Sequence, residues 1–257
     1  MLALVLSMMV IGGVVSMYIS TIRASSDTLN SVQLNHDLDS IMQVMSSELR
    51  RAGSWGGAIA GSDARENPFV QNKISRIQIG HKDGEEDDSC ILYAYDADGN
   101  GVDEDPKNLG KDYDGNALVV LSRDELYGFR LNNGGIDMRL SVASTTDKNA
   151  LDADEDGCDE GTWRNIIDTG NVAISELSFS IERSKCFNKD TNEVYAGEDG
   201  DTSCAQAISE GDLDAGNIIE TLLVDIELEG EAKGDDESVK SLVMAVKVRN
   251  NRIFTQP

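Results

Sequence analysis

The sequence MLALVLSMMVIGGVVSMYIST (Met1–Thr21) decides the fold, because it lacks charged side chains and can cross a membrane as a helix. At about 1.5 Å rise per residue this segment spans roughly 30 Å, close to the thickness of a hydrocarbon core. Its apolar side chains include Leu2, Leu4, Val5, Met8, Val10, Ile11, Val14 and Val15. We therefore predict a helix half over residues 1–22 that suits lipid or the apolar centre of a filament.

The helical pattern continues beyond Arg23, but there only one face is apolar. Apolar residues recur at three- and four-residue spacing at Leu34, Leu38, Ile41, Met42, Met45 and Leu49. Arg50 and Arg51 suit a helix C-terminus, and Gly53 supplies a usual stop. Residues 23–52 are therefore expected to form an amphipathic helix half that packs on a globular domain. A cleaved signal peptide and an ordinary single-span anchor are the alternatives, although nothing basic precedes the apolar segment.

Composition limits what the rest of the chain can be. The protein has 257 residues, and residues 53–257 are enough for one β-rich extracytoplasmic domain. The formal net charge of -25 argues against nucleic-acid partners and against docking of the domain on anionic headgroups.

Four cysteines, Cys90, Cys158, Cys186 and Cys204, make an even number in a chain with a membrane-compatible start. In extracytoplasmic proteins such a number indicates disulfides, and four cysteines allow three pairings. We favour Cys186 with Cys204, closing a short polar loop, and Cys90 with Cys158, tying two acidic regions together. Buried free thiols are the alternative.

Short apolar or alternating segments predict strands at residues 74–79, 91–95, 118–122, 126–131, 136–140, 172–183, 222–229 and 242–249. Residues 126–131 and 136–140 are separated by Asn132–Gly135, which suit a tight reversal. The last two strands are expected to pair across a charged loop, Gly230–Ser238, while residues 184–216 are expected to be a polar loop. Because the helix carries a matching apolar stripe, helix packed on antiparallel sheet, an α+β fold, is the simplest architecture.

Two acidic loops carry alternating oxygen ligands of the kind that Ca²⁺ prefers: Asp96, Asp98 and Asn100 in the first, and Asp152, Asp154 and Asp156 in the second. The position of the bidentate glutamate of an EF-hand holds Lys107 in the first loop and Trp163 in the second. A true EF-hand is therefore excluded, and a looser calcium site is the remaining expectation. The alternative is a pair of solvated turns, which favour the same residues.

No pattern of catalytic residues is present. The two histidines, His36 and His81, lie among polar residues, and no nucleophile, zinc-ligand or phosphate-binding motif occurs. We expect a protein that is not an enzyme.

The stretches LDSIMQVMSSELRRAGSWGG (Leu38–Gly57), SCILYAYDADGNG, LYGFRLNNGGIDMRL and the region of Cys158, Trp163 and Asp168 resemble the PilW type of minor pilins. The N-terminal helix is also similar to that of J-type pseudopilins of type II secretion. The resemblance covers most of the chain. It departs at the start, where these families carry a basic leader, a Gly and a Phe-Thr-Leu-x-Glu segment. Met1 lies beyond that point, either because the start is assigned too late or because the leader end is missing.

The resemblance implies a pilin-like fold and a structural subunit that takes part in type IV pilus assembly, in its initiation or in a tip complex. It implies other pilin subunits as partners through the N-terminal helix. The implied location is the bacterial inner membrane, with the domain in the periplasm, and then the pilus or pseudopilus. A membrane-anchored, calcium-dependent adhesion module is the alternative function, and an anchored hydrolase is disfavoured because no nucleophile is visible.

Overall fold

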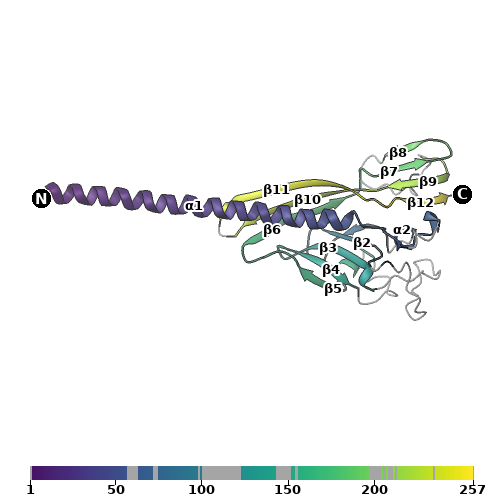
Figure 1. Ribbon diagram of the computed structural model, residues 1–257, viewed down its shortest axis with the longest axis horizontal. Coiled ribbons are helices and arrows are strands. Elements are labelled where there is room, and N and C mark those ends of the chain that lie inside the picture. The colour runs from purple at the N-terminus through teal and green to yellow at the C-terminus, as the bar shows by residue number, and fades with distance from the viewer. Residues whose placement is uncertain are drawn as a thin grey trace.

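The computed structural model describes residues 2–56, 63–71, 75–97, 99, 123–142, 152–153, 156–196, 204, 207, 211, 213–233 and 235–256, with the side chains of the first helix from residue 7 onward. One helix, α1 (Leu2–Leu49), projects from a β-rich head (Figure 1). The N-terminus lies at the free end of this helix, and the C-terminus lies at the opposite end of the molecule.

The head consists mainly of short strands and includes a short helix, α2 (Pro68–Gln71). The described strands are β1 (Gln78–Gly80), β2 (Cys90–Ala94), β3 (Leu126–Asn132), β4 (Gly135–Ser141), β5 (Thr162–Asn165), β6 (Val172–Ser180), β7 (Lys185–Asn188), β8 (Val194–Ala196), β9 (Gly216–Thr221), β10 (Leu223–Ala232), β11 (Asp235–Lys247) and β12 (Arg252–Gln256). Three-residue 3₁₀ turns occur at Ala64–Glu66, Arg123–Glu125 and Asp156–Cys158.

Among the described residues the strands form three antiparallel sheets, with the orders β1-β2-β3-β4-β5, β11-β10-β6 and β12-β9-β7-β8. The first two sheets and α1 share the main hydrophobic core, which contains Leu38, Met45, Phe129, Phe179 and Ile226. The third sheet has a separate, smaller core around Cys186 and Ile218. The expected α+β fold, with the helix packed on antiparallel sheet, is confirmed.

The hairpin expected in the middle of the chain is present. Strands β3 and β4 pair with Asn132 opposite Gly135, so that Asn133 and Gly134 form the turn. Both turn residues have positive φ, 49° and 73°, as a two-residue hairpin that follows the strand twist requires.

Strands β10 and β11 form the long hairpin under α1, but the predicted loop Gly230–Ser238 is wrong. Strand β10 continues to Ala232, which pairs with Asp235 at the start of β11. Buried and less buried residues still alternate in this part of β10. The small residues Gly230 and Ala232 are buried, whereas Glu229 and Glu231 are partly exposed. The charged residues Glu229 and Glu231, which indicate a loop in the sequence, lie within strand β10.

The polar loop expected over residues 184–216 is also wrong, since it contains β7 and β8 and the start of β9. These strands are short and carry polar residues, so their sequence lacks a hydrophobic pattern. The strand expected over 74–79 is found at 78–80, and the strand expected over 118–122 lies outside the described residues. Strands β5 and β12 have no counterpart in the sequence prediction.

Candidate functional site: the projecting helix and its joint with the head

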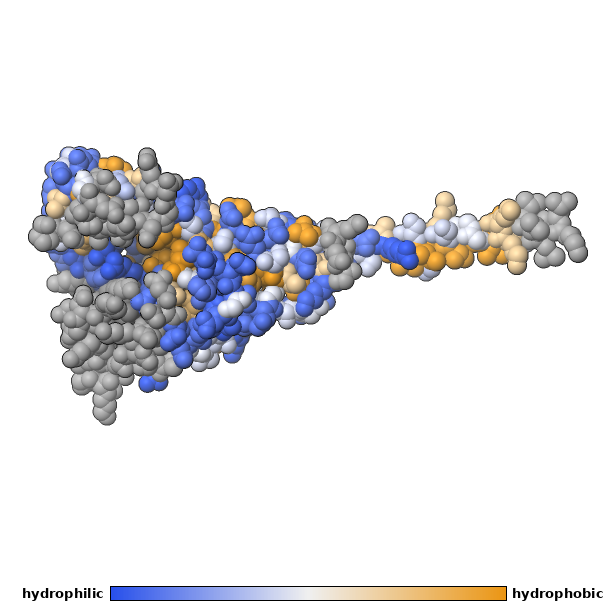
Figure 2. Space-filling model, turned by 180° about the vertical axis from the view of Figure 1, so that it is seen from behind, coloured by the Kyte–Doolittle hydropathy of each residue, from blue (hydrophilic) through white to orange (hydrophobic). Residues whose placement is uncertain are grey.

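The first part of α1 is apolar and makes no contact that buries it. Met8, Val10, Ile11, Val14 and Val15 are between 50% and 77% exposed. Figure 2 shows apolar residues along one side of the projecting helix, away from the head. The helix is long and apolar enough to cross a membrane, and none of its most apolar window is buried. Leu2, Leu4 and Val5 belong to α1, but their side chains lie outside the described part.

The packed part of α1 begins at Leu34. Leu34, Leu38, Met42, Met45 and Leu49 are at most 2% exposed and face the strands of the main core. The sheet is shaped for this approach, because a Cβ added to Gly230 would lie 3.1 Å from Cδ2 of Leu38. The glycine therefore allows helix and sheet to approach more closely than a larger residue would.

The end of α1 is bonded to three other segments of the head. The backbone N–H of Gly53, whose φ is 73°, donates to the carbonyl oxygen of Ala94 at 2.8 Å. Asn67 Nδ2 donates to the carbonyl of Gly53, and Asn250 Nδ2 donates to the carbonyl of Ala52, each at 2.9 Å. These bonds tie the turn that follows the helix to three segments of the head, and they fix the direction of the helix relative to the head.

A polar and aromatic cluster lies beside this end of the helix. Tyr95 Oη donates to Glu48 Oε2 at 2.8 Å, and the guanidinium of Arg51 lies 4.1 Å from the centre of the Tyr95 ring. Tyr127 stacks on Tyr95 with ring centres 4.3 Å apart. Burial, and then the bond to Glu48, raise the pKa of Tyr95 well above its usual value near 10. The phenol therefore stays protonated and acts as a donor to the carboxylate.

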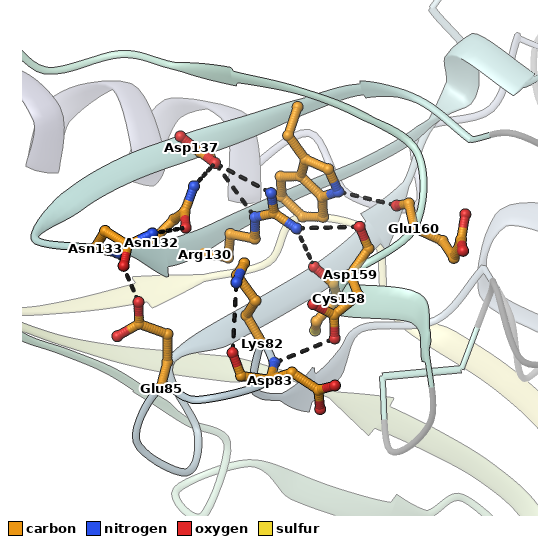
Figure 3. Close-up of polar contacts among 11 residues, drawn as sticks. Lys82, Asp83, Glu85, Arg130, Asn132, Asn133, Asp137, Cys158, Asp159 and Glu160 are labelled. Atoms are coloured by element: carbon orange, nitrogen blue, oxygen red, sulfur yellow. Dashed lines mark hydrogen bonds and ion pairs between the residues drawn. The ribbon is translucent and has the colours of Figure 1, made fainter.

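A second buried network holds the segment around Cys158 on the first sheet. Arg130 of β3 donates from Nε and Nη2 to Asp137 of β4, at 3.3 and 3.2 Å (Figure 3). Its Nη1 donates to the carbonyls of Cys158 and Asp159, and its guanidinium lies 4.2 Å from the centre of the Trp163 ring. One side chain thus joins a hairpin, a loop and β5.

Arg139 is a buried cation that is bonded to carbonyl groups. It is 1% exposed and donates to the backbone oxygens of Leu126, Tyr127 and Gly157. Burial lowers the pKa of Arg139 to about 9, which still leaves it charged at neutral pH. Together Arg130 and Arg139 place two positive charges against the Gly157–Asp159 backbone.

The disulfides are Cys90–Cys158 and Cys186–Cys204, the pairs favoured from the sequence. The first ties the Cys158 segment to β2, and the second lies in the core of the third sheet. Two disulfides beside a projecting apolar helix fit a membrane-anchored domain in an oxidising compartment such as the periplasm.

The first acidic loop is described only at Asp96 among its predicted calcium ligands. Both oxygens of Asp96 accept backbone N–H groups, Oδ2 from Gly56 at 2.8 Å and Oδ1 from Gly99 at 2.7 Å. This carboxylate therefore closes a turn near the end of the helix. Asp98 and Asn100 lie outside the described residues.

In the second acidic loop Asp152 is 8% exposed, whereas Asp156 is exposed. The carbonyl of Asp152 accepts a hydrogen bond from the N–H of Gly157. The carbonyl of Cys158 accepts from Arg130, and the carbonyl of Gly157 accepts from Arg139. Asp154 lies outside the described residues. Within the described ranges no group of three acidic, histidine or cysteine side chains is placed to hold a metal ion, and calcium binding stays a prediction.

Sequence reasoning missed the residues that join the helix to the head and the loop to the sheet. Glu48 and Tyr95 are 47 residues apart, and Arg130 and Cys158 are 28 apart. No local spacing connects such positions. Alternation along β3 places Arg130 on the face opposite Phe129 and Leu131, which suggests exposure, whereas both faces of the strand are buried here.

Two comparisons with known proteins bear on what this arrangement is. The chain is 24% identical to an uncharacterized protein of Haemophilus influenzae over 159 residues, which cover 58% of the chain and 66% of that protein. The match thus spans slightly less than two thirds of the relative's length. No solved structure matches the chain significantly. The family model of prepilin peptidase-dependent protein B matches residues 27–248, from the helix to just beyond β11. Since this match covers most of the chain, the protein belongs to the prepilin peptidase-dependent protein B family and is a pilin-related protein.

Proposed function

We propose that this protein is a minor pilin of the PilW type, a structural subunit rather than an enzyme. It acts in type IV pilus assembly, in the initiation of the filament or in a complex at its tip. The observation that carries this proposal is the apolar part of α1, which projects from the head with its side chains exposed.

An exposed apolar helix of this length needs an apolar environment, because water solvates its side chains poorly. Lipid supplies that environment before assembly, with the helix in the inner membrane and the head in the periplasm. Neighbouring helices supply it in a filament, where packing replaces lipid contacts. The helix therefore exchanges one apolar environment for another without passing through water.

The joint between helix and head supports the same role. The helix end is held by hydrogen bonds from Gly53, Asn67 and Asn250 and by the contact between Glu48 and Tyr95. A subunit drawn out of a membrane must transmit force from its helix to its head, and this joint combines buried packing with directional bonds. The partners are other pilin subunits, and they bind through α1.

The first test is a pair of matched substitutions in the full chain, produced in a bacterium that lacks its own copy. Val14 is 62% exposed on the projecting helix, and Val194 is 63% exposed on β8 of the head. Val14→Glu puts a charge into the apolar part of α1, at a cost of several kcal/mol in lipid or between helices. Val194→Glu makes the same change on a surface exposed to water.

We expect Val14→Glu to abolish incorporation of the chain into sheared filaments and Val194→Glu to leave it unchanged. Immunogold labelling of a tag after Pro257 should mark filament ends rather than their whole length. Filament numbers that do not depend on the chain, or equal incorporation of both variants, would refute the proposal.

A further inference from the structure

Arg76, between α2 and β1, is half-buried, and its guanidinium faces Arg252 and Glu220. Its Nε is buried and makes no hydrogen bond with a described residue. Burial lowers the pKa of Arg76, repulsion by Arg252 lowers it further, and attraction by Glu220 acts in the opposite direction. A buried N–H donor without a hydrogen bond is costly, so this position calls for a group that accepts from Nε.

Arg76 lines a small cavity beside the joint of helix and head. Arg252 and Glu220 share the lining with Arg76, and apolar walls come from Phe69, Val70 and Val248. Ala52 and Gly53, at the end of α1, complete the inner side. The cavity has a volume of about 20 Å³ for water-sized groups, which is enough for one of them.

The charges around the cavity do not balance. Glu220 accepts from Arg252 Nη1 at 3.5 Å and from the N–H of Cys204 at 3.4 Å. Arg252 also donates from Nε to Gln71 Oε1 at 3.3 Å and lies 4.0 Å from the centre of the Phe254 ring. Two guanidinium groups therefore share one carboxylate, which leaves an excess of one positive charge at the cavity. This excess is notable in a protein with a net charge of -25.

We propose that this cavity binds a small monovalent anion of the size of a halide ion, held between Arg76 and Arg252. A water molecule could accept a hydrogen bond from Arg76 Nε, but it would leave the charge unneutralised. A polyatomic carboxylate exceeds the space for one water-sized group. The anion would link the segment before β1 to strand β12 of the third sheet, beside the turn that follows α1.

The probes are sodium chloride and sodium bromide, compared with sodium gluconate at the same ionic strength. The full chain in a non-ionic detergent is melted and followed by circular dichroism. At about ten times Kd we expect chloride and bromide to raise Tm by about 3 to 6 °C over gluconate. The matched variants are Arg76→Gln, which removes the proposed ligand, and Arg164→Gln, which removes an exposed arginine of β5.

Arg76→Gln should lose the rise in Tm, and Arg164→Gln should keep it. A rise that survives in Arg76→Gln, or equal Tm values in chloride and gluconate, would overturn the site. If Arg76→Gln does not fold, crystals of the unmodified chain grown in bromide decide the question. An anomalous peak beside Arg76 is expected, and its absence would equally overturn the proposal.

Discussion

The phenol of Tyr95 donates a hydrogen bond to the carboxylate of Glu48 over 2.8 Å, and this bond connects the last turn of α1 to the residue after β2. Glu48 also accepts from Arg51 at 3.3 Å, so the carboxylate is shared between a phenol and a guanidinium. The orientation of the helix relative to the head thus depends on a side-chain contact as well as on apolar packing.

Tyr95→Phe should lower the free energy of unfolding of the head by about 1.5 to 3 kcal/mol, because it removes a donor to a charged acceptor and keeps the ring. Chemical unfolding of the full chain in detergent measures the change. Tyr18→Phe is the control, since Tyr18 is 67% exposed on the projecting helix. Equal stability of the two variants would show that the bond contributes nothing.

Alkaline pH should destabilise the head through the same tyrosine. The pKa of Tyr95 is raised in the folded state, so its contribution to stability is complete below pH 10 and falls as pH rises beyond it. Tyr93 and Tyr127 have raised pKa values as well and act in the same direction. Removing Tyr95 by Tyr95→Phe should reduce the slope of stability against pH above 10 by at most about 1.4 kcal/mol per pH unit. An unchanged slope would mean that Tyr95 ionises equally well in both states.

The two disulfides should differ in their contribution to stability. Cys90 and Cys158 are 68 residues apart, whereas Cys186 and Cys204 are 18 apart. Loop-closure entropy predicts a loss of about 4 kcal/mol for replacing the first pair with serines and about 3 kcal/mol for the second. Urea unfolding of the two double variants measures this order. The reverse order would show that local packing outweighs chain entropy.

Arg130→Gln should be among the most damaging single substitutions in the head, at about 3 to 5 kcal/mol, because it leaves Asp137 buried without its cation. Arg164→Gln, an exposed change on β5, should cost less than about 0.5 kcal/mol. Adding Asp137→Asn to Arg130→Gln should recover part of the loss, and thermal melting of the three variants tests this. Full additivity of the two substitutions would contradict a direct pair.

Calcium binding to the acidic loops predicts a higher Tm in millimolar calcium than in the same concentration of magnesium, with the counter-ion held constant. Binding to the folded state alone raises Tm in proportion to the logarithm of calcium concentration above Kd. Asp152→Asn should then reduce the rise. Identical melting in calcium, magnesium and chelator would refute the calcium prediction.

The sequence alone determined the helix with its apolar and amphipathic halves, the α+β architecture, and the hairpin around Asn133 and Gly134. These features depend on local information: uninterrupted hydropathy, a repeat of three to four residues, and turn residues that tolerate positive φ. The stripe from Leu34 to Leu49 identified the face that packs on the sheet because helical geometry fixes which residues lie together.

Tertiary structure decided the rest. Strands β7, β8 and β12 have weak patterns, and they form because neighbouring strands and a disulfide supply the partners. The hydrogen bond between Tyr95 and Glu48, and the repulsion between Arg76 and Arg252, arise only after segments distant in the chain have packed. The physical reason is that electrostatic and hydrogen-bond contacts between distant residues depend on distance in space and on burial, and neither quantity is set by spacing along a chain.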